Sequence, residues 1–127
     1  MMTYTEATAE NFTWGPNWCT PSKEQMDELL KAATSEGSTK VVCTYTQENS
    51  QWGFKFTGKE EGYTGNSVFF HAVYGEDDFG DAYYWSATAD GGGTWRMRLC
   101  YGEGDFFSDW GSFAPTSEFL VRPVLKN

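Results

Sequence analysis

The sequence lacks any concentration of basic residues. It holds 9 Lys and Arg against 18 Asp and Glu, which gives a formal net charge of -9 at pH 7. Nucleic acids and anionic membranes are bound largely through clustered Lys and Arg. We therefore expect no nucleic-acid partner and no attraction to an anionic membrane. The acidity itself is typical of a soluble, solvated surface.

Long apolar runs are also missing, so no segment reaches the length that spans a bilayer. We expect no membrane insertion by this domain. The start Met1–Tyr4 has neither the charged region nor the apolar stretch of a signal peptide. A start of this kind is also what an excised domain of a longer surface protein would have. The length of 127 residues predicts a single domain over 1–127, which is large enough to bury a core without the help of disulfides or metals.

Cysteine and histidine are too few for most catalytic or zinc sites. Cys19, Cys43 and Cys100 are widely spaced, with no CxxC or Cys/His pattern. Either all three stay reduced, or one disulfide forms and one thiol remains. The single histidine, His71, lies in an apolar strand-like segment, where we expect a structural role rather than a nucleophilic one. We therefore expect no enzyme activity and no cofactor.

The segment Glu76–Asp81 is rich in carboxylates, which are the ligands that calcium prefers. Its spacing does not match the twelve-residue calcium loop. A solvated acidic loop is the favoured interpretation and a calcium site the alternative. We expect folding to need no metal.

Aromatic residues make up 18% of the chain, which favours strands and surface aromatics over a helical bundle. Apolar spacing predicts helices early and strands later, an α+β order. Thr20 or Ser22 can cap the longer helix, Ser22 together with Gln25. The expected helices cover 5–12 and 20–34; the expected strands cover 40–46, 51–57, 66–73, 83–88, 94–101 and 119–124; loops cover 74–81 and 102–116.

Alternation along the predicted strand 94–101 assigns its side chains to two faces. Trp95, Met97 and Leu99 are expected to point into the core. Arg96, Arg98 and Cys100 are then expected to point outward, where an unpaired cysteine adds nothing to stability.

Five ordered segments together resemble the bacterial FISUMP-type domains over about residues 5–124. In order along the chain they are Trp18–Leu30, Phe54–Gly58, Asn66–Phe70, Tyr84–Thr88 and Val121–Val124. The chain departs from the family pattern at Cys19, at His71 and in the longer, more aromatic segment 106–113.

The resemblance implies a C-type lectin-like fold, in which two helices pack on a small twisted antiparallel sheet and a loop-rich face binds ligands. That fold is shared with formylglycine-generating oxidases and with the variable proteins of diversity-generating retroelements. In the variable proteins, the diversified positions lie between the segments that match Tyr84–Thr88 and Val121–Val124. The protein is thus expected to be a receptor-binding or adhesion module on a bacterial cell surface or phage tail, and to bind a protein or glycan ligand.

Arginines and aromatic residues on loops above a rigid sheet are typical of binding hot spots. We accordingly predict a ligand-binding face made of Arg96, Arg98, Tyr101, Asp105, Phe107, Asp109 and Phe113. Two alternatives remain: an enzyme related to the formylglycine-generating oxidases, which would use a pair of thiols, and a purely structural domain of a surface protein.

Overall fold

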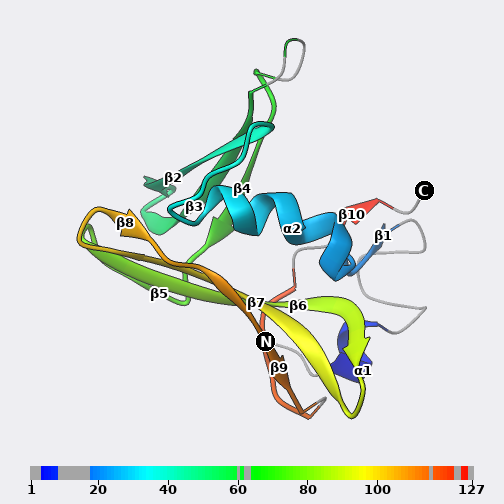
Figure 1. Ribbon diagram of the computed structural model, residues 1–127. Coiled ribbons are helices and arrows are strands. Elements are labelled where there is room, and N and C mark those ends of the chain that lie inside the picture. Colours follow the sequence, from blue (N-terminus) through cyan, green and yellow to red (C-terminus); the bar gives the residue numbers. More distant parts are fainter. Residues whose placement is uncertain are drawn as a thin grey trace. The chain divides into compact units, whose positions relative to one another are not determined.

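The computed structural model describes residues 4–8, 18–59, 61, 64–114, 116–121 and 124–125 (Figure 1). By its contacts the chain divides into two compact units. Unit 1 comprises Met1–Met26, Tyr83–Met97 and Trp110–Asn127, and unit 2 comprises Asp27–Ala82 and Arg98–Asp109. In the described part of the chain, no helix has the length and apolar character needed to cross a membrane.

Strands dominate both units. A three-stranded antiparallel sheet has the order β2 (Val41–Glu48), β3 (Gln51–Gly58), β4 (Ser67–His71). A five-stranded sheet has the order β5-β6-β7-β8, with β9 paired to β7, and a short pair joins β1 to β10. The remaining strand bounds are β1 Trp18–Cys19, β5 Tyr74–Gly75, β6 Phe79–Asp90, β7 Gly93–Gly102, β8 Asp105–Phe106, β9 Asp109–Phe113 and β10 Val124–Leu125.

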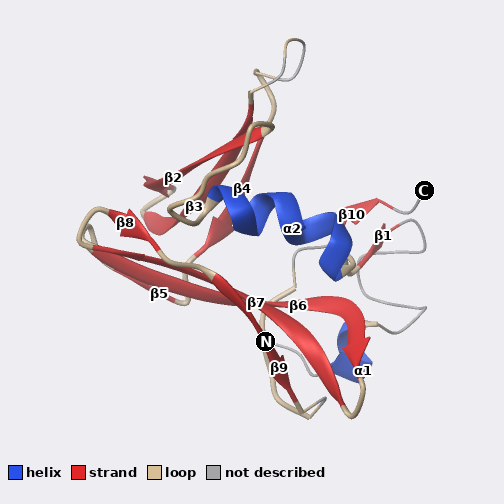
Figure 2. Cartoon of the chain, in the orientation of Figure 1, coloured by secondary structure: helices blue, strands red, loops and turns tan. Residues whose placement is uncertain are grey.

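The predicted C-type lectin-like fold, with two helices on one small sheet, is wrong. Strands account for 53% and helices for 12% of the structure, and most of the strands lie in the two larger antiparallel sheets (Figure 2). The first expected helix is only the single turn α1, Tyr4–Ala7, and its expected continuation lies outside the described residues. Among the residues that the structure describes, α2, Lys23–Ala32, is the one helix longer than a single turn.

Helix α2 begins after Ser22, the alternative to Thr20 among the two caps that the sequence offers. Ser22 is the N-cap: its Oγ accepts from the Gln25 backbone at 3.1 Å, while the Gln25 side chain accepts from the Ser22 backbone at 2.8 Å. The other candidate cap, Thr20, instead donates its hydroxyl to the Ala7 carbonyl. Met26 in α2 and Ala33 just after it are buried, at 2% and 0% exposed.

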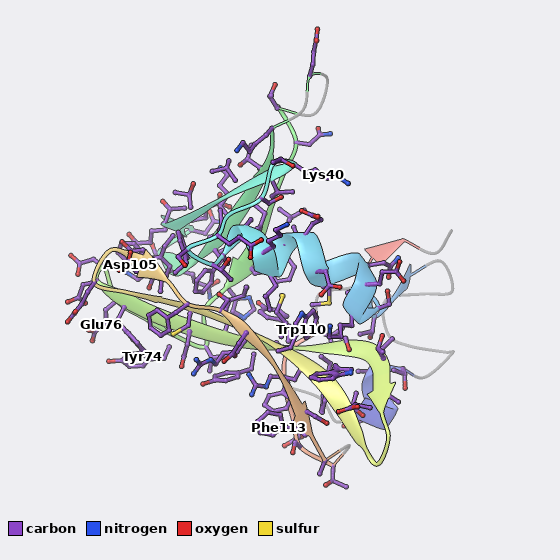
Figure 3. The ribbon with its side chains drawn as sticks, in the orientation of Figure 1. Lys40, Tyr74, Glu76, Asp105, Trp110 and Phe113 are labelled. Carbon is purple, nitrogen blue, oxygen red and sulfur yellow. The ribbon has the colours of Figure 1, made fainter. Side chains whose placement is uncertain are left out.

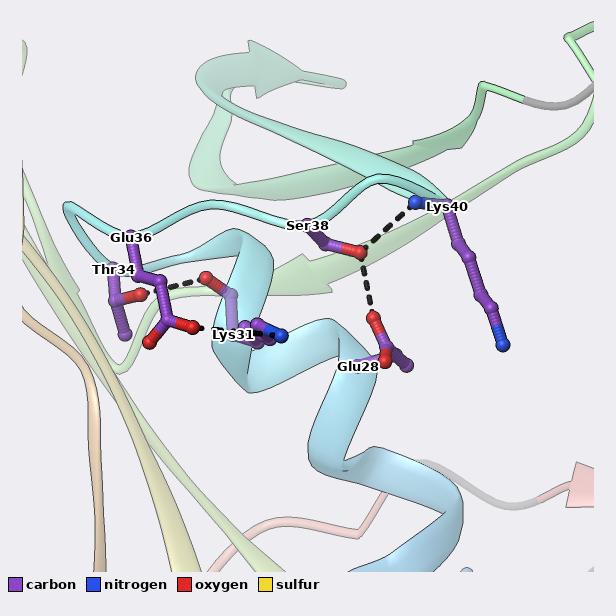
Figure 4. Close-up of polar contacts among 6 residues, drawn as sticks. All are labelled: Glu28, Lys31, Thr34, Glu36, Ser38 and Lys40. Atoms are coloured by element: carbon purple, nitrogen blue, oxygen red, sulfur yellow. Dashed lines mark hydrogen bonds and ion pairs between the residues drawn. The ribbon is translucent and has the colours of Figure 1, made fainter.

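Polar contacts fix the segment that follows α2 (Figure 4). The Thr34 hydroxyl donates to the Lys31 carbonyl at 2.7 Å, and Ser38 donates to Glu28 at 2.7 Å. The Ser38 hydroxyl also accepts from the Lys40 backbone at 3.1 Å. The chain is thus held through the turn that leads into β2.

Two segments predicted to be loops contain strands instead. In 74–81, the backbone N–H of Glu76 donates to the Phe79 carbonyl at 2.7 Å and closes a tight hairpin between β5 and β6. In 102–116, the chain turns at Glu103 and Gly104, which have φ values of 51° and 87°. A two-residue turn with both φ values positive matches the twist of paired strands, so β7 continues into β8.

The last predicted strand, 119–124, is also different in the structure. Leu120 forms an isolated parallel bridge with Tyr84: its N–H donates to Tyr83 at 3.0 Å, and its carbonyl accepts from Trp85 at 2.9 Å. Residues 122 and 123 lie outside the described part, and β10 begins at Val124. On the strand 94–101 the interior assignments of Met97 and Leu99 are confirmed, since both are 0% exposed, whereas Trp95 is only half-buried. Phe54 and Phe56 of β3 are also buried, at 0% and 2% exposed.

Candidate functional site

The predicted binding residues are divided between the two units. Arg96 and Phe113 belong to unit 1, and the other five belong to unit 2. The structure therefore describes them as two separate sets. The residues of each set contact neighbours within their own unit, and these contacts differ between the two sets.

In unit 1, Arg96 is a core residue. It is 6% exposed, so its predicted outward position is wrong. Its guanidinium carbon lies 4.2 Å from the ring centroid of Phe113, 4.9 Å from Tyr83 and 5.5 Å from Phe119. Burial of a cation against aromatic faces explains how an arginine is accommodated where simple alternation predicts solvent.

Gly111 in β9 leaves room for the Arg96 guanidinium. A Cβ added to Gly111 would lie 2.8 Å from Nη2 of Arg96 and 2.8 Å from the Phe113 ring. The guanidinium therefore lies directly against the β9 backbone. Arg96 and Phe113 form a structural cluster, although Phe113 remains 39% exposed.

Cys100 was also expected to be exposed, and this prediction is wrong: it is 2% exposed. Its N–H donates to the Ser108 hydroxyl at 3.0 Å, and its carbonyl accepts from the Phe107 N–H at 3.0 Å. Phe107 is 47% exposed. Its backbone is therefore fixed while its ring faces solvent.

The other predicted residues of unit 2 have local partners. Arg98 and Asp109 form an ion pair, with 3.2 Å between Nε and Oδ1. The Tyr101 ring stacks on Tyr45 with 4.5 Å between centroids, and it is only partly exposed. Asp105 is exposed and pairs with Gly102 across β7 and β8.

Two exposed aromatic residues near Phe107 were not predicted. Tyr74 is 54% and Phe79 37% exposed, and their ring centroids are 5.9 Å apart. A Cβ added to Gly102 would lie 3.3 Å from Phe107 and 3.4 Å from Phe79, so both rings approach the same face of Gly102. We call Tyr74, Phe79 and Phe107 the aromatic patch.

The aromatic patch lies on two connected hairpin tips. The N–H of Glu103, in the β7–β8 turn, donates to the Asp78 carbonyl in the β5–β6 turn at 3.2 Å. The Tyr74 hydroxyl donates to Glu76 Oε1 at 3.0 Å. Figure 3 shows Tyr74, Glu76 and Asp105 at the same end of this unit. A signal for the patch was present in the sequence, since Tyr74 and Phe79 flank the acidic run.

Tyr45 supports the β5–β6 tip. Its hydroxyl lies 2.6 Å from the Glu76 carbonyl and 2.9 Å from the Phe79 carbonyl, and donates to both. Burial raises the pKa of Tyr45 to about 12, and Asp78 and Asp77 contribute to the rise. The hydroxyl consequently keeps its proton, and these hydrogen bonds, throughout the neutral pH range.

The described residues offer little support for thiol or metal chemistry. Cys43 and Cys100 are free and buried. Burial raises the pKa of Cys43 to about 12 and also raises the pKa of Cys100. Within the described ranges, no group of three or more His, Cys, Asp and Glu is placed to hold a metal ion. His71 is the last residue of β4 and is exposed.

These thiols should react slowly. In a Cys19→Ser variant, which retains only Cys43 and Cys100, we expect the folded protein at pH 8 to react with Ellman's reagent roughly 100-fold or more slowly than the urea-unfolded protein, because the thiolate is the reactive form. Absorbance at the released thiolate checks this. Rapid release of one equivalent from the folded variant would contradict it.

Comparison of the chain with family models, with curated proteins and with solved structures finds no match in any of the three.

Proposed function

We propose that this protein is a non-enzymatic ligand-binding module and that the aromatic patch is its contact surface. The observation that carries the proposal is the exposure of three large aromatic side chains next to one another on a hydrogen-bonded backbone. Contiguous exposed aromatic surface is typical of interaction sites, where such rings gain the most from burial by a partner. Cys43 and Cys100 do not favour the thiol-dependent enzyme alternative, because both are buried.

The predicted site residues enter this proposal unequally. Phe107 belongs to the aromatic patch, and Asp105 lies on the adjoining tip. Tyr101 stacks on Tyr45, which in turn hydrogen-bonds the β5–β6 tip. Arg98 and Asp109 form an ion pair with each other. Arg96 and Phe113 are assigned to stability of unit 1.

The resemblance to FISUMP-type domains and to retroelement variable proteins rests on the five sequence segments. The burial of Arg96 and Cys100 weighs against diversified positions there, since those should point outward. We keep display on a bacterial surface or phage tail as part of the proposal. A reverse transcriptase gene beside a near-repeat of the coding region for 95–124 would support the variable-protein relation.

The patch variant Tyr74→Ala/Phe79→Ala/Phe107→Ala tests the proposed function. Ligands are first selected on the immobilised native protein from a random peptide display library and from a glycan panel. We expect the selected ligands to bind the patch variant at least tenfold more weakly, as expected when hot-spot aromatics are truncated. Titration calorimetry measures the affinities.

Val42→Ala/Val68→Ala is the matched control. Both valines are exposed and lie in the three-stranded sheet of the same unit. The control should retain affinity, and both variants should keep the melting temperature of the native protein within a few degrees. Selected ligands that bind the patch variant as tightly as the native protein, or the absence of any selected ligand, would overturn the proposal.

A further inference from the structure

The two hairpin tips that carry the aromatic patch are rich in acidic residues. The tip segments 74–81 and 102–108 contain six of the chain's 18 acidic residues and none of its 9 basic residues. Five of the six acids are exposed, namely Glu76, Asp77, Asp78, Glu103 and Asp105. The charge of the tips is therefore strongly negative relative to their size.

The acids act on the patch itself. Glu76 accepts the hydrogen bond of the Tyr74 hydroxyl, and this bond and the charge of Glu76 raise the pKa of Tyr74. Asp78 contributes in the same direction. The carboxylates of the β5–β6 tip therefore act electrostatically on Tyr74, which is one of the three patch residues.

Aromatic faces and carboxylates favour the same class of ligand. The face of a Tyr or Phe ring attracts a guanidinium or ammonium, and carboxylates accept hydrogen bonds from the same groups. Unit 1 already uses ring faces in this way, since Lys23 Nζ lies 5.2 Å from the centroid of Trp95 and 4.9 Å from that of Trp110. A basic partner would complement both features of the tip, whereas an acidic partner would be repelled.

We infer that the aromatic patch and its five carboxylates bind a basic, extended protein segment that carries arginine or lysine next to apolar residues. The inference rests on the proposed function and specifies its ligand. The apolar side chains of the segment cover the rings, and its cations lie over the ring faces and between the carboxylates. Association is faster and tighter at low salt, because exposed charges are screened within about 10 Å at 0.1 M ionic strength.

The direct test is titration calorimetry with a synthetic twelve-residue peptide that contains four arginines and two leucines among glycines. A second peptide replaces each arginine by citrulline, which keeps the shape and removes the charge. We expect the arginine peptide to bind at least tenfold more tightly than the citrulline peptide at 50 mM salt, and the difference to shrink about tenfold at 500 mM salt.

Neutralised variants locate the interaction. Asp77→Asn/Asp78→Asn/Asp105→Asn should weaken binding of the arginine peptide about tenfold, as expected for the loss of three exposed ion pairs. The control Glu24→Gln/Asp90→Asn/Glu118→Gln removes the same charge from exposed positions of unit 1 and should change affinity less than twofold.

The outcomes separate the two proposals. Equal affinity for the arginine and citrulline peptides, or equal weakening by both neutralised variants, overturns the basic-segment inference. If the patch variant still binds the selected peptides or glycans more weakly than the native protein, the proposed function stands even though the basic-segment inference fails. If no selected ligand depends on the patch, both fail.

Discussion

Replacement of Trp85 by alanine should lower the free energy of unfolding by about 3–5 kcal/mol, the usual loss for a large buried aromatic residue. Trp85 is 0% exposed in the core of unit 1. Its ring meets Phe119 edge-on with 4.8 Å between centroids, and its backbone N–H donates to the Leu120 carbonyl at 2.9 Å. Alanine would leave a cavity beside Phe119 and loosen the segment that bridges to β6.

Urea denaturation followed by circular dichroism measures the loss. Trp85→Phe should recover part of it, because a smaller ring still contacts Phe119. Tyr74→Ala is the matched exposed truncation and should cost within about 0.5 kcal/mol. Similar losses for Trp85→Ala and Tyr74→Ala would show that the assignment of interior and surface is wrong.

Arg96→Ala should destabilise the protein by about 2–4 kcal/mol, even though arginine is normally a surface residue. Cation–π contacts contribute about 0.5–2 kcal/mol each, depending on burial, and Arg96 makes three of them. Its aliphatic stem is also buried, so truncation removes packing as well as charge.

Three further variants separate these contributions in the same denaturation assay. Arg96→Met keeps an apolar stem and should lose less than alanine does. Arg96→Lys should also be destabilised, because an ammonium is more strongly hydrated than a guanidinium and cannot stack. Arg98→Ala removes a partly exposed ion pair and should cost at most about 1 kcal/mol. Arg96→Ala as mild as Arg98→Ala would rule out a structural role for Arg96.

Local signals in the sequence predicted part of the fold well. The Ser22–Gln25 capping box marks the start of α2, and period-2 alternation assigns Met97 and Leu99 to the core. Both features depend on neighbours a few residues apart. They can therefore be interpreted without knowing which distant segments meet.

The errors arose where distant contacts decide the structure. Acidic and glycine-rich segments resemble loops, but the tight turns at 76–79 and 103–104 let them pair as strands. Alternation assigned Arg96 to solvent, because nothing nearby in the sequence reveals that Tyr83, Phe113 and Phe119 surround it. The five ordered segments implied a two-helix fold that the strand pairing overturns.

The candidate site is predictable from the sequence only in part, for the same physical reason. Phe107 and Asp105 were recognised as aromatic and acidic residues of one segment. Tyr74 and Phe79 were missed, because their proximity to Phe107 depends on the meeting of two hairpin tips around Gly102.

The hydrogen bonds on either side of Phe107 have a practical consequence for engineering. Its own N–H is held by the Cys100 carbonyl, and the next residue, Ser108, is held through its N–H by Ala33 and through its hydroxyl by Cys100. None of these bonds uses the side chain at position 107. The backbone of Asp105 is likewise paired with Gly102, while its side chain is exposed. A combinatorial library at positions 105 and 107, with Phe106 and Ser108 unchanged, should yield folded members at high frequency, and so offers a starting point for selecting binders of new specificity.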